Sequence, residues 1–496
     1  MIQSIDYAAI APSLILALMA GLVLLLDAFL PRTRTLLTAV TFAGVLASLV
    51  AVILQATAGR TLSTFCVPPD RRHPAPACSY VVDDLTLVFA AVVLTTALVI
   101  VLLSATQFTR PGAIPVGEWY FLLLCTLAGA VTLPASRDLI MLVVALELVS
   151  LPIFAMAALK RYDAKGSEAA LKLFLVSVIS TAVMLFGVSL LYGLTGSVHL
   201  DRIAAGLTAP VPVPGAAPGG VLAVGVVLVI AGFAFKVAAV PFHFWAGDVY
   251  QGAPLPVAAL LSVISKAAGF AGLILVLTIA LAGQTAFWSP VVAVLSALTM
   301  TAGNLLALRQ RDPVRLLAWS SVAQSGYILA PLGVQGENAV GAATAYLAIY
   351  AAMNIGAFAV VMLVPGSGDL DDHRGLAFRR PAAALSLAFF LVCLAGLPPG
   401  LAGLFAKVVV FREIVDGGGA WLAVVMAVNT VIGLYYYLAW MARLFVPTPA
   451  TPPVGDPTLT DGRLAAARPA AVAVAMALAL SVAFSLAPQL ILSVVG

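Results

Sequence analysis

Long runs of apolar residues recur along the whole chain, and they limit its fold more than any other feature does. The run from Leu85 to Leu103 is one example, and each window of about 20 such residues can cross a bilayer as a helix. Of the 496 residues, 62% are hydrophobic and only 9% are charged. A transmembrane barrel would instead alternate apolar and polar residues in segments of about ten. The sequence therefore predicts an all-α polytopic membrane protein.

We expect about fourteen transmembrane helices, taken as the apolar windows between polar or proline-rich loops. They span residues 7–29, 36–56, 84–105, 119–135, 138–159, 168–193, 221–245, 256–281, 289–308, 315–333, 338–364, 382–411, 420–445 and 469–494. The first segment lacks a basic start and a convincing cleavage site, so we interpret it as a retained helix and not as a signal peptide.

The basic residues predict an orientation in the membrane. An even number of crossings places both termini on one side. With the termini outside, most loop arginines and lysines, among them Arg34 and Lys160, face the cytoplasm, as the positive-inside rule requires. The polar loop that contains Cys66 and Cys78 then faces outward, where a disulfide between them would close a short ring. Two free thiols remain the alternative.

Five ionisable residues lie inside the predicted membrane helices: Glu147, Lys172, Lys236, Lys266 and Lys407. A charge at the centre of a membrane helix costs about 2.5 to 3.5 kcal/mol. A purely structural bundle would not need all five groups. The alternative, that a residue joins helices or extends to the interface, applies best to Lys172, which lies only about one turn inside its helix.

Two of these lysines lie beside interruptions in their helices. Pro241 follows Lys236 in the seventh predicted helix, where it removes a backbone donor. Pro398 and Pro399 precede Lys407 in the twelfth. Broken membrane helices expose backbone carbonyls, which are tolerated only where protein or water satisfies them. We therefore predict a polar, ion-handling site beside each break.

The two broken helices lie five crossings apart, which suggests an inverted repeat. On this interpretation, residues 1–118 form an N-terminal three-helix segment, and residues 119–281 and 289–445 form two five-helix units of opposite orientation. Residues 446–496 add a linker and the last helix.

The buried groups form a series that can pass protons. Glu147 close to Lys236 would stabilise the ammonium, whereas separating the pair would leave a desolvated amine that holds its proton less tightly. Lys266 and then Lys407 are the next acceptors. His243 could connect this row to the inner surface, because imidazole exchanges protons near neutral pH. A hydrogen-bonded histidine at the interface is an equally good interpretation of His243.

The sequence predicts no redox cofactor in this chain. Its 4 cysteines are too few and too scattered for an iron–sulfur cluster. No Gly-rich turn follows a strand-like pattern either. The net charge of +4 gives no indication of nucleic-acid binding.

The segments VPFHFWAGDVYQGAP, SKAAGF, LELVSLP and AGLPPGLAGLFAK together closely resemble the antiporter-like membrane subunits of respiratory complex I. In that family a glutamate of helix five, lysines of helices seven and eight, and a lysine or glutamate of helix twelve form the proton path. The matching positions here are Glu147, Lys236, Lys266 and Lys407, with Lys172 of EAALK as a further member.

The resemblance implies fourteen helices with two inverted repeats, and a pump module in a bacterial cell membrane. The partners would be sister antiporter-like subunits and small membrane subunits. Flavin and iron–sulfur clusters would lie in a peripheral arm that oxidises NADH, while quinone is reduced elsewhere in the complex. Gln324 departs from the family pattern, because many relatives have histidine there and glutamine does not titrate.

Three alternatives remain open at this stage. The chain could belong to a multi-subunit cation/proton antiporter, which has the same lysine and glutamate groups. It could be a structural subunit whose charges only join helices. It could also belong to a related complex with a different electron donor.

Overall fold

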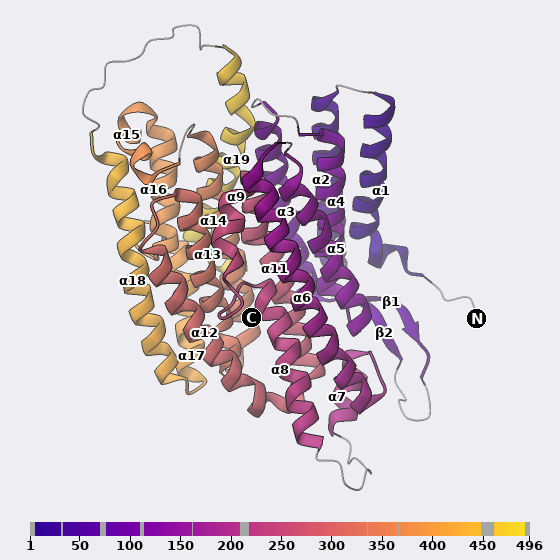
Figure 1. Ribbon diagram of the computed structural model, residues 1–496. Helices are drawn as coiled ribbons and strands as arrows, with labels where there is room; N and C mark the ends of the chain where they lie inside the picture. The colour runs from indigo at the N-terminus through magenta and orange to yellow at the C-terminus, as the bar shows by residue number, and fades with distance from the viewer. Residues whose placement is uncertain are drawn as a thin grey trace.

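The computed structural model describes residues 5–30, 33–69, 76–109, 114–160, 162–208, 218–334, 336–364, 368–447 and 461–491. In this part of the chain nearly all residues are helical, and the long helices run roughly parallel or antiparallel to one another (Figure 1). Twelve of the described segments are long and apolar enough to cross a membrane. The chain is therefore a helical membrane protein with many crossings, as the apolar runs predict.

Six long helices precede the first interruption, and all lie close to their predicted positions. They are α1 Tyr7–Phe29, α2 Arg34–Ala58, α3 Asp84–Gln107, α4 Val116–Thr132, α5 Leu139–Ala158 and α6 Ala164–Thr195. The largest shift at a start is in α6, which begins at Ala164 instead of residue 168.

Aspartates begin several helices by accepting hydrogen bonds from first-turn N–H groups. The capping residues are Asp6, Asp83, Asp138, Asp163 and Asp312. These carboxylates lie at helix ends, where backbone N–H groups donate to them. Glu147 is different, because it lies in the middle of α5.

The middle of the chain contains the first interruption. The predicted helix 221–245 is divided into α8 Pro218–Lys236 and α9 Trp245–Gly252, separated by turns. The next predicted helix is continuous but irregular. It consists of α10 Leu255–Leu260, the π-helical segment η2 Leu261–Ser265, α11 Lys266–Leu275 and a second π-helical segment, η3 Val276–Ala280.

The later helices follow the predicted order. They are α12 Thr285–Ala307, α13 Pro313–Leu329, α14 Ala339–Leu363, α16 Pro381–Ala395, α17 Leu401–Asp416, α18 Ala420–Phe445 and α19 Asp461–Leu486. Short elements connect them and their predecessors: α7 Leu200–Thr208, α15 Leu376–Arg379, and the 3-10 turns η1 Leu133–Ala135, η4 Ala282–Gln284, η5 Pro331–Gly333 and η6 Leu370–His373.

The difference between fourteen predicted crossings and twelve long helices has a simple origin. The helix predicted at 315–333 is represented by α13, which has only 17 residues. The helix predicted at 382–411 is divided into α16 and α17, of 15 and 16 residues. Both regions are helical at the expected places, but neither contains one long apolar helix.

The loop between α2 and α3 contains a β-hairpin that the all-helical prediction did not include. Strand β1 Leu62–Val67 pairs antiparallel with β2 Ala77–Val82, and Cys66 lies directly opposite Cys78. The two cysteines form a disulfide. The sequence predicts only a polar loop here, because its prolines and arginines hide the short alternating segments at its two ends.

The two ends of the described chain lie at the same end of the bundle. The backbone N–H of Asp6, just before α1, donates to the Thr64 hydroxyl of β1 at 3.1 Å. Leu490, after α19, lines a cavity together with Val88, which lies in the first turns of α3 after the hairpin. Residues 1–4 and 492–496 lie outside the described part.

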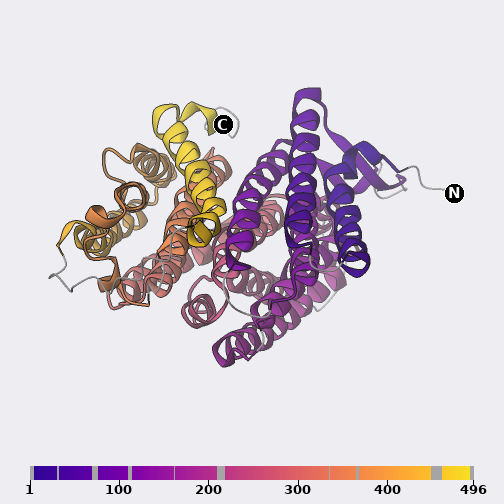
Figure 2. The same cartoon turned by 90° about the horizontal axis from the view of Figure 1, so that it is seen from above.

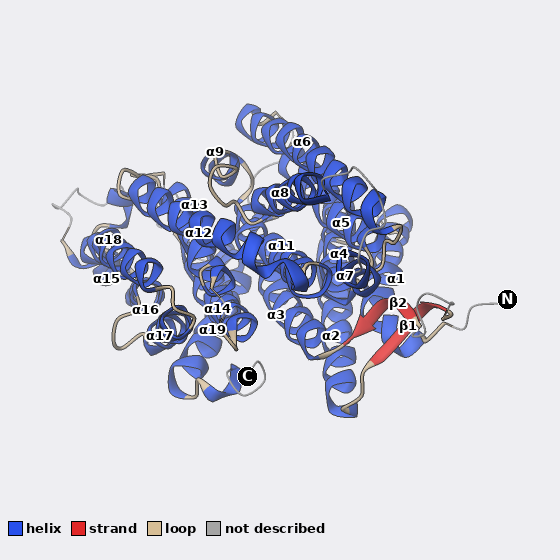
Figure 3. Cartoon of the chain, turned by 90° about the horizontal axis from the view of Figure 1, so that it is seen from below, coloured by secondary structure: helices blue, strands red, loops and turns tan. Residues whose placement is uncertain are grey.

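Three helices form the centre of the molecule. From below, α3, α11 and α14 lie between α1 on one side and α18 on the other (Figure 3). From above, the N-terminal and C-terminal helices occupy the two sides of an elongated bundle (Figure 2). Helix α14 packs against α3, α13, α16, α17 and α19, and nearly all of its residues are buried. The polar groups of these central helices are therefore removed from lipid.

We predict that Gly303→Ala lowers the free energy of unfolding by about 1 to 3 kcal/mol. A Cβ atom at Gly303 of α12 would clash with the backbone nitrogen of Ala323 in α13, and that backbone cannot move without separating the helices. The measurement is thermal unfolding of the detergent-purified chain. Gly21→Ala is the matched control, because a Cβ there meets no atom within 4 Å. Equal midpoints for both variants would contradict the prediction.

Candidate functional site

The interruption of the seventh predicted helix lies directly after Lys236. Helix α8 ends at this residue, and the next turns include Ala238, with a φ of 57°, and Pro241. Helix α9 begins only at Trp245. The prediction that the helix breaks beside Lys236 is confirmed, and the break leaves carbonyl groups of the turn available to other side chains.

Lys236 forms an ion pair with Glu147 inside the bundle. Its Nζ lies 3.3 Å from the Oε1 atom of Glu147. It also donates to the hydroxyls of Ser150 at 2.7 Å and Ser177 at 3.0 Å. The Thr181 hydroxyl donates to the same Glu147 oxygen at 2.7 Å. The pair is thus held by α5, α6 and α8, and its remaining hydrogen-bonding capacity is largely satisfied.

The two members of the pair differ in exposure. The Lys236 side chain is 6% exposed, whereas that of Glu147 is 24% exposed. Protein groups therefore stabilise the ammonium charge of Lys236, whereas the Glu147 carboxylate also reaches the surface of this chain. A charge-assisted bond in such surroundings is strong when made and unfavourable to break without a replacement partner.

Lys266 lies one helix further in, at the junction between the π-helical segment η2 and α11. Its Nζ donates to the carbonyls of Ser321 at 2.7 Å and Val237 at 3.3 Å, and to the Ser325 hydroxyl at 2.5 Å. Within the described residues no carboxylate forms an ion pair with it. The Val237 carbonyl belongs to the break after Lys236, so this break supplies one of the ligands of the Lys266 amine.

Lys407 lies beside the second interruption. Helix α16 ends at Gly396, which has a φ of 81°, and α17 begins at Leu401. The Lys407 Nζ donates to the carbonyls of Ala395 at 2.6 Å and Leu394 at 3.2 Å. These carbonyls are exposed by the end of α16. The break thus supplies the ligands of the amine, as the sequence predicts for a broken membrane helix.

Helix α13 contacts both of the inner amines. Its Ser325 accepts from Lys266, and the Lys407 Nζ lies 5.5 Å from the centre of the Tyr327 ring. Tyr327 also stacks on Tyr346 of α14, with ring centres 6.0 Å apart. Residues 320–327 of α13 therefore form a polar segment that contacts both lysines. This segment contains no carboxylate, histidine, lysine or arginine.

Gln324 lies in this polar segment. Its Oε1 accepts from the Tyr346 hydroxyl at 2.6 Å, and its Nε2 donates to the Tyr437 hydroxyl at 3.2 Å. Tyr437 also shares a hydrogen bond with Ser320. The amide therefore bridges α13, α14 and α18 through neutral groups.

Two further hydrogen-bonded groups surround the row. Tyr350 of α14 donates to Ser321 at 2.7 Å, and Asn354 donates to Ser262 at 2.8 Å. On the other side, Asn304 contacts Tyr327, Tyr436 and Asn429. Sequence reasoning missed these residues, because a single hydroxyl or amide in an apolar run is common. The polar cluster in WSSVAQSGY was the one signal that could have indicated them.

Lys172 does not join the row in this structure. Its Nζ lies 2.7 Å from Glu168 and 3.1 Å from Asp248, and its side chain is 44% exposed. Asp248 in turn forms an ion pair with Arg315 at 2.9 Å. A polar cavity of about 220 Å³ lies over these residues. Lys172 thus connects α6 to α9 and α13 at the surface, which agrees with the interfacial alternative.

His243 lies in the turn between α8 and α9. The edge of its ring meets Trp319 of α13, with centres 5.7 Å apart. Its Nδ1 atom is buried and has no hydrogen-bond partner among the described residues. No hydrogen bond between described residues joins it to Lys236. The predicted link from the row to the surface through His243 therefore stays a prediction.

No metal site is found in the part of the chain that the structure describes. There, no three side chains of His, Cys, Asp or Glu come together as ligands. The chemistry of the row consists of an ion pair, two neutral-ligand amine sites, and hydroxyls and amides between them.

Comparisons with known proteins agree with this geometry. A family model described as NADH:quinone oxidoreductase/Mrp antiporter, TM, matches residues 136–433. NADH-quinone oxidoreductase subunit N 2 of Streptomyces griseus subsp. griseus is 53% identical over 456 residues, which are 90% of this chain and 83% of that protein.

Two solved structures have the same fold. A chain in a structure of respiratory complex I from Thermus thermophilus is 32% identical, with a TM-score of 0.77, and the match covers 97% of this chain and 98% of that one. A chain in a structure of the Mrp complex from Dietzia sp. DQ12-45-1b has a TM-score of 0.83 at 23% identity, covering 99% and 96% of the two chains. At that identity the second likeness shows the fold alone.

The interrupted helices and buried lysines define an antiporter-like membrane subunit. The chain belongs to the subunit N family of NADH-quinone oxidoreductase, the antiporter-like membrane subunits of respiratory complex I. It is therefore a membrane subunit of that enzyme and assembles with other subunits. Within the family, lysine at position 407 and the segment LELVSLP indicate this subunit type.

We predict that Asp248→Asn raises the acetylation rate of Lys172 about two- to threefold, because the amine loses one of its two carboxylate partners. The folded protein is treated briefly with an acetylating reagent. Mass spectrometry of its peptides then measures the acetylation of each lysine.

Asp163→Asn is the matched control for this experiment. Lys160 donates to Asp163 at 2.8 Å, and this bond holds the pKa of that carboxyl below its usual range. The control should raise the labelling of Lys160 and leave Lys172 unchanged. Unchanged labelling of Lys172 in Asp248→Asn would mean that the ion pair does not hold the amine.

Proposed function

We propose that this subunit moves protons through Glu147, Lys236, Lys266 and Lys407, driven by quinone reduction elsewhere in complex I. The observation that carries the proposal is the ion pair between Glu147 and Lys236, at 3.3 Å, beside a broken membrane helix. A buried amine whose partner can be withdrawn changes its affinity for a proton. The groups that follow it in space are themselves amines.

The first transfer needs a change in the ion pair. With Glu147 close, Lys236 keeps its proton as an ammonium. When the pair opens, burial favours the neutral amine, and the released proton can pass toward Lys266. The carbonyl of Val237, which accepts from Lys266 at 3.3 Å, follows Lys236 directly in the chain. Each proton moved against 100 mV requires about 2.3 kcal/mol, so the opening must be driven by the partner subunits.

The second transfer crosses the neutral segment of α13. Ser325 and Gln324 can orient water or hydroxyl groups, but neither changes its charge near neutral pH. A proton that moves from Lys266 to Lys407 therefore travels through hydroxyls and water. This requirement is specific to a chain with glutamine at position 324.

The finer architecture belongs to the same proposal. We infer fourteen crossings, with α13 as one and the pair α16 and α17 as another. We also infer two inverted five-helix units at 119–281 and 289–445, flanked by segments 1–118 and 446–496. The breaks beside Lys236 and Lys407 support this repeat, and the location of both ends of the described chain at one end of the bundle supports an even number of crossings.

The location and partners follow from this function. We propose that the protein lies in a bacterial cell membrane with its termini and the Cys66–Cys78 hairpin outside. Its neighbours would be sister antiporter-like subunits and small membrane subunits, while flavin and iron–sulfur clusters belong to other subunits. A disulfide in the hairpin supports an oxidising, external location.

The competing function is cation/proton exchange in an assembly without NADH or quinone. The reason to consider cation/proton exchange is that this chain shares its fold with a chain of the Mrp complex. Sodium-dependent transport that is insensitive to quinone-site inhibitors would select this alternative. Co-purification with flavin and iron–sulfur subunits would select the respiratory complex.

We predict that Lys236→Ala and Glu147→Ala each reduce proton pumping by at least about tenfold, because each removes one half of the ion pair. The measurement is acidification of inverted membrane vesicles by NADH, with NADH:quinone reduction and the amount of assembled complex measured in parallel.

The control variant is Lys160→Ala, which removes an exposed amine paired with Asp163. It should leave pumping unchanged. Loss of assembly in both ion-pair variants, together with normal pumping per assembled complex, would instead identify the pair as structural. The neutral variant Glu147→Gln keeps the size of the side chain and separates loss of charge from loss of packing.

We also predict that Gly396→Ala reduces pumping severalfold. A Cβ at Gly396 would lie 3.0 Å from the Cδ atom of Lys407 and 3.2 Å from its Nζ, so the amine must leave its carbonyl ligands. Gly418→Ala is the matched control, since it has a similar φ of 76° but a Cβ there meets no atom within 4 Å. Both variants strain the backbone alike. Equal pumping by the two would show that the position of Lys407 is unimportant.

A further inference from the structure

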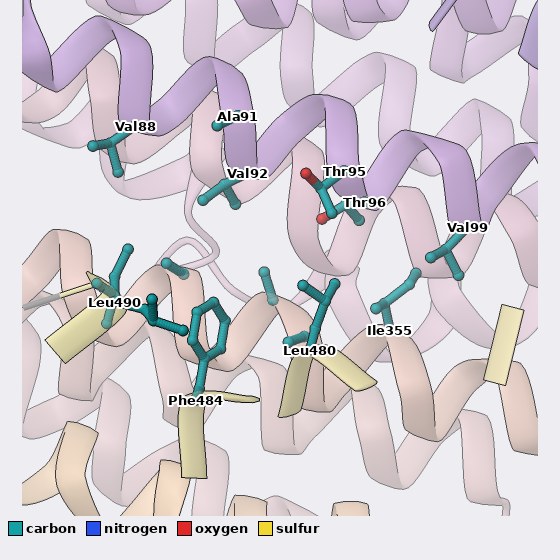
Figure 4. A pocket seen from close by; sticks show the side chains of 14 residues that line it. Val88, Ala91, Val92, Thr95, Thr96, Val99, Ile355, Leu480, Phe484 and Leu490 are labelled. Carbon is teal, nitrogen blue, oxygen red and sulfur yellow. The ribbon is translucent and has the colours of Figure 1, made fainter. Parts of the chain in front are cut away.

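Two apolar grooves open between helices of the described chain. The first has a volume of about 280 Å³ and lies between α3, α14 and the end of α19. Val88, Val92 and Val99 face Ile355, Leu480 and Phe484 across it (Figure 4). Among the described residues, Thr95 and Thr96 are its only polar lining residues, and no charged side chain lines it. Nothing at this groove selects one occupant.

The second groove is larger and has a charged end. Its volume is about 710 Å³, and it lies between α2, the end of α3 and the beginning of the described side chains of α19. Arg34, Thr35 and Thr109 line one end, where α2 begins and α3 has just ended. Phe42 and Leu46 continue the lining along α2. The positively charged Arg34 side chain thus lies at the mouth of this apolar groove.

Arg34 is able to bind an anion at this mouth. The residue is exposed, and its Nη1 donates to the Phe108 carbonyl at 3.2 Å, which fixes the guanidinium against α3. No carboxylate of a described residue forms an ion pair with it. A guanidinium presents several N–H donors in a plane that matches the oxygens of a phosphate. Its remaining donors can therefore contact a phosphate group.

The length of the groove matches one leaflet of a bilayer. Leu46 lies twelve residues after Arg34, which corresponds to about 18 Å of helix at about 1.5 Å per residue. Half of a hydrocarbon core of about 30 Å is about 15 Å. A molecule with an anionic head at Arg34 and apolar chains toward Leu46 therefore fits the groove from the interface to about the bilayer centre.

We propose that this groove binds one phospholipid with an anionic headgroup. Its phosphate contacts Arg34, and its acyl chains lie along Phe42, Leu46 and Leu102. The charge at the mouth distinguishes this occupant from an apolar helix of a neighbouring subunit, which would leave the guanidinium without an anion. Arg34, at the start of α2, also lies on the side predicted to face the cytoplasm, where anionic lipids attract basic residues.

Photo-crosslinking in the assembled complex tests the proposal. Complex purified in mild detergent is reconstituted with phosphatidylglycerol or phosphatidylcholine that contains a diazirine in one acyl chain. After irradiation, mass spectrometry locates the lipid adducts. We expect phosphatidylglycerol adducts on the parts of α2 and α3 that line the groove, and about fivefold fewer of them in Arg34→Gln. Labelling by phosphatidylcholine should change little.

Two further variants complete the experiment. Arg60→Gln removes an exposed arginine beyond the other end of α2 and should leave the adducts unchanged. Ala43→Trp fills the groove and should remove adducts of both lipids, so it tests the site even if Arg34→Gln does not assemble. Val92→Trp fills the groove of Figure 4 and should leave the number of lipid adducts on α2 unchanged.

Several results would overturn the proposal. Equal labelling of the wild-type groove by both lipids would show that the headgroup charge is not recognised. Undiminished phosphatidylglycerol adducts in Arg34→Gln would do the same. A photoreactive amino acid at position 42 that crosslinks to another subunit, or to a second copy of this chain, would show that protein covers the groove instead.

Discussion

The ion pair between Glu147 and Lys236 is the constraint on which the rest of the structure depends. An amine inside a membrane helix is unfavourable unless protein groups replace its water, and here a carboxylate and two serine hydroxyls do so. These partners come from α5 and α6, so the pair fixes three helices around the break in α8. The break in turn exposes the carbonyl that Lys266 uses. One buried charge thus determines both the local packing and the location of the next amine.

The other two buried amines are stabilised in a different way. Lys407 and Lys266 have no carboxylate partner among the described residues, and backbone carbonyls and a hydroxyl accept their hydrogen bonds instead. Such neutral ligands stabilise an ammonium less than a carboxylate does. On the mechanism we propose, a proton released when the ion pair opens moves from Lys236 toward these two neutral sites. Helix α13 touches both inner amines, and the proposed transfer between them therefore runs along this helix.

The sequence predicted the parts of this arrangement that depend on single strong signals. Apolar length predicted the helices, and the prolines predicted the breaks beside Lys236 and Lys407. The β-hairpin and the π-helical turns were not predictable, because short alternation and a one-residue shift in hydrogen bonding leave little trace in a sequence. The location of Lys172 depends on Asp248 and Arg315, which are distant in the chain. The hydroxyls and amides between the lysines were also missed, since only packing shows which helices share them.

The central claim is that Lys236, Lys266 and Lys407 form one series that protons can follow. A density map of the assembled complex, at a resolution that shows ordered water, tests this claim most directly. The account predicts water molecules between Lys266 and Lys407 along Ser325 and Gln324, and Glu147 within hydrogen-bonding distance of Lys236. Apolar side chains or lipid filling the space between the amines, with no ordered water there, would contradict it.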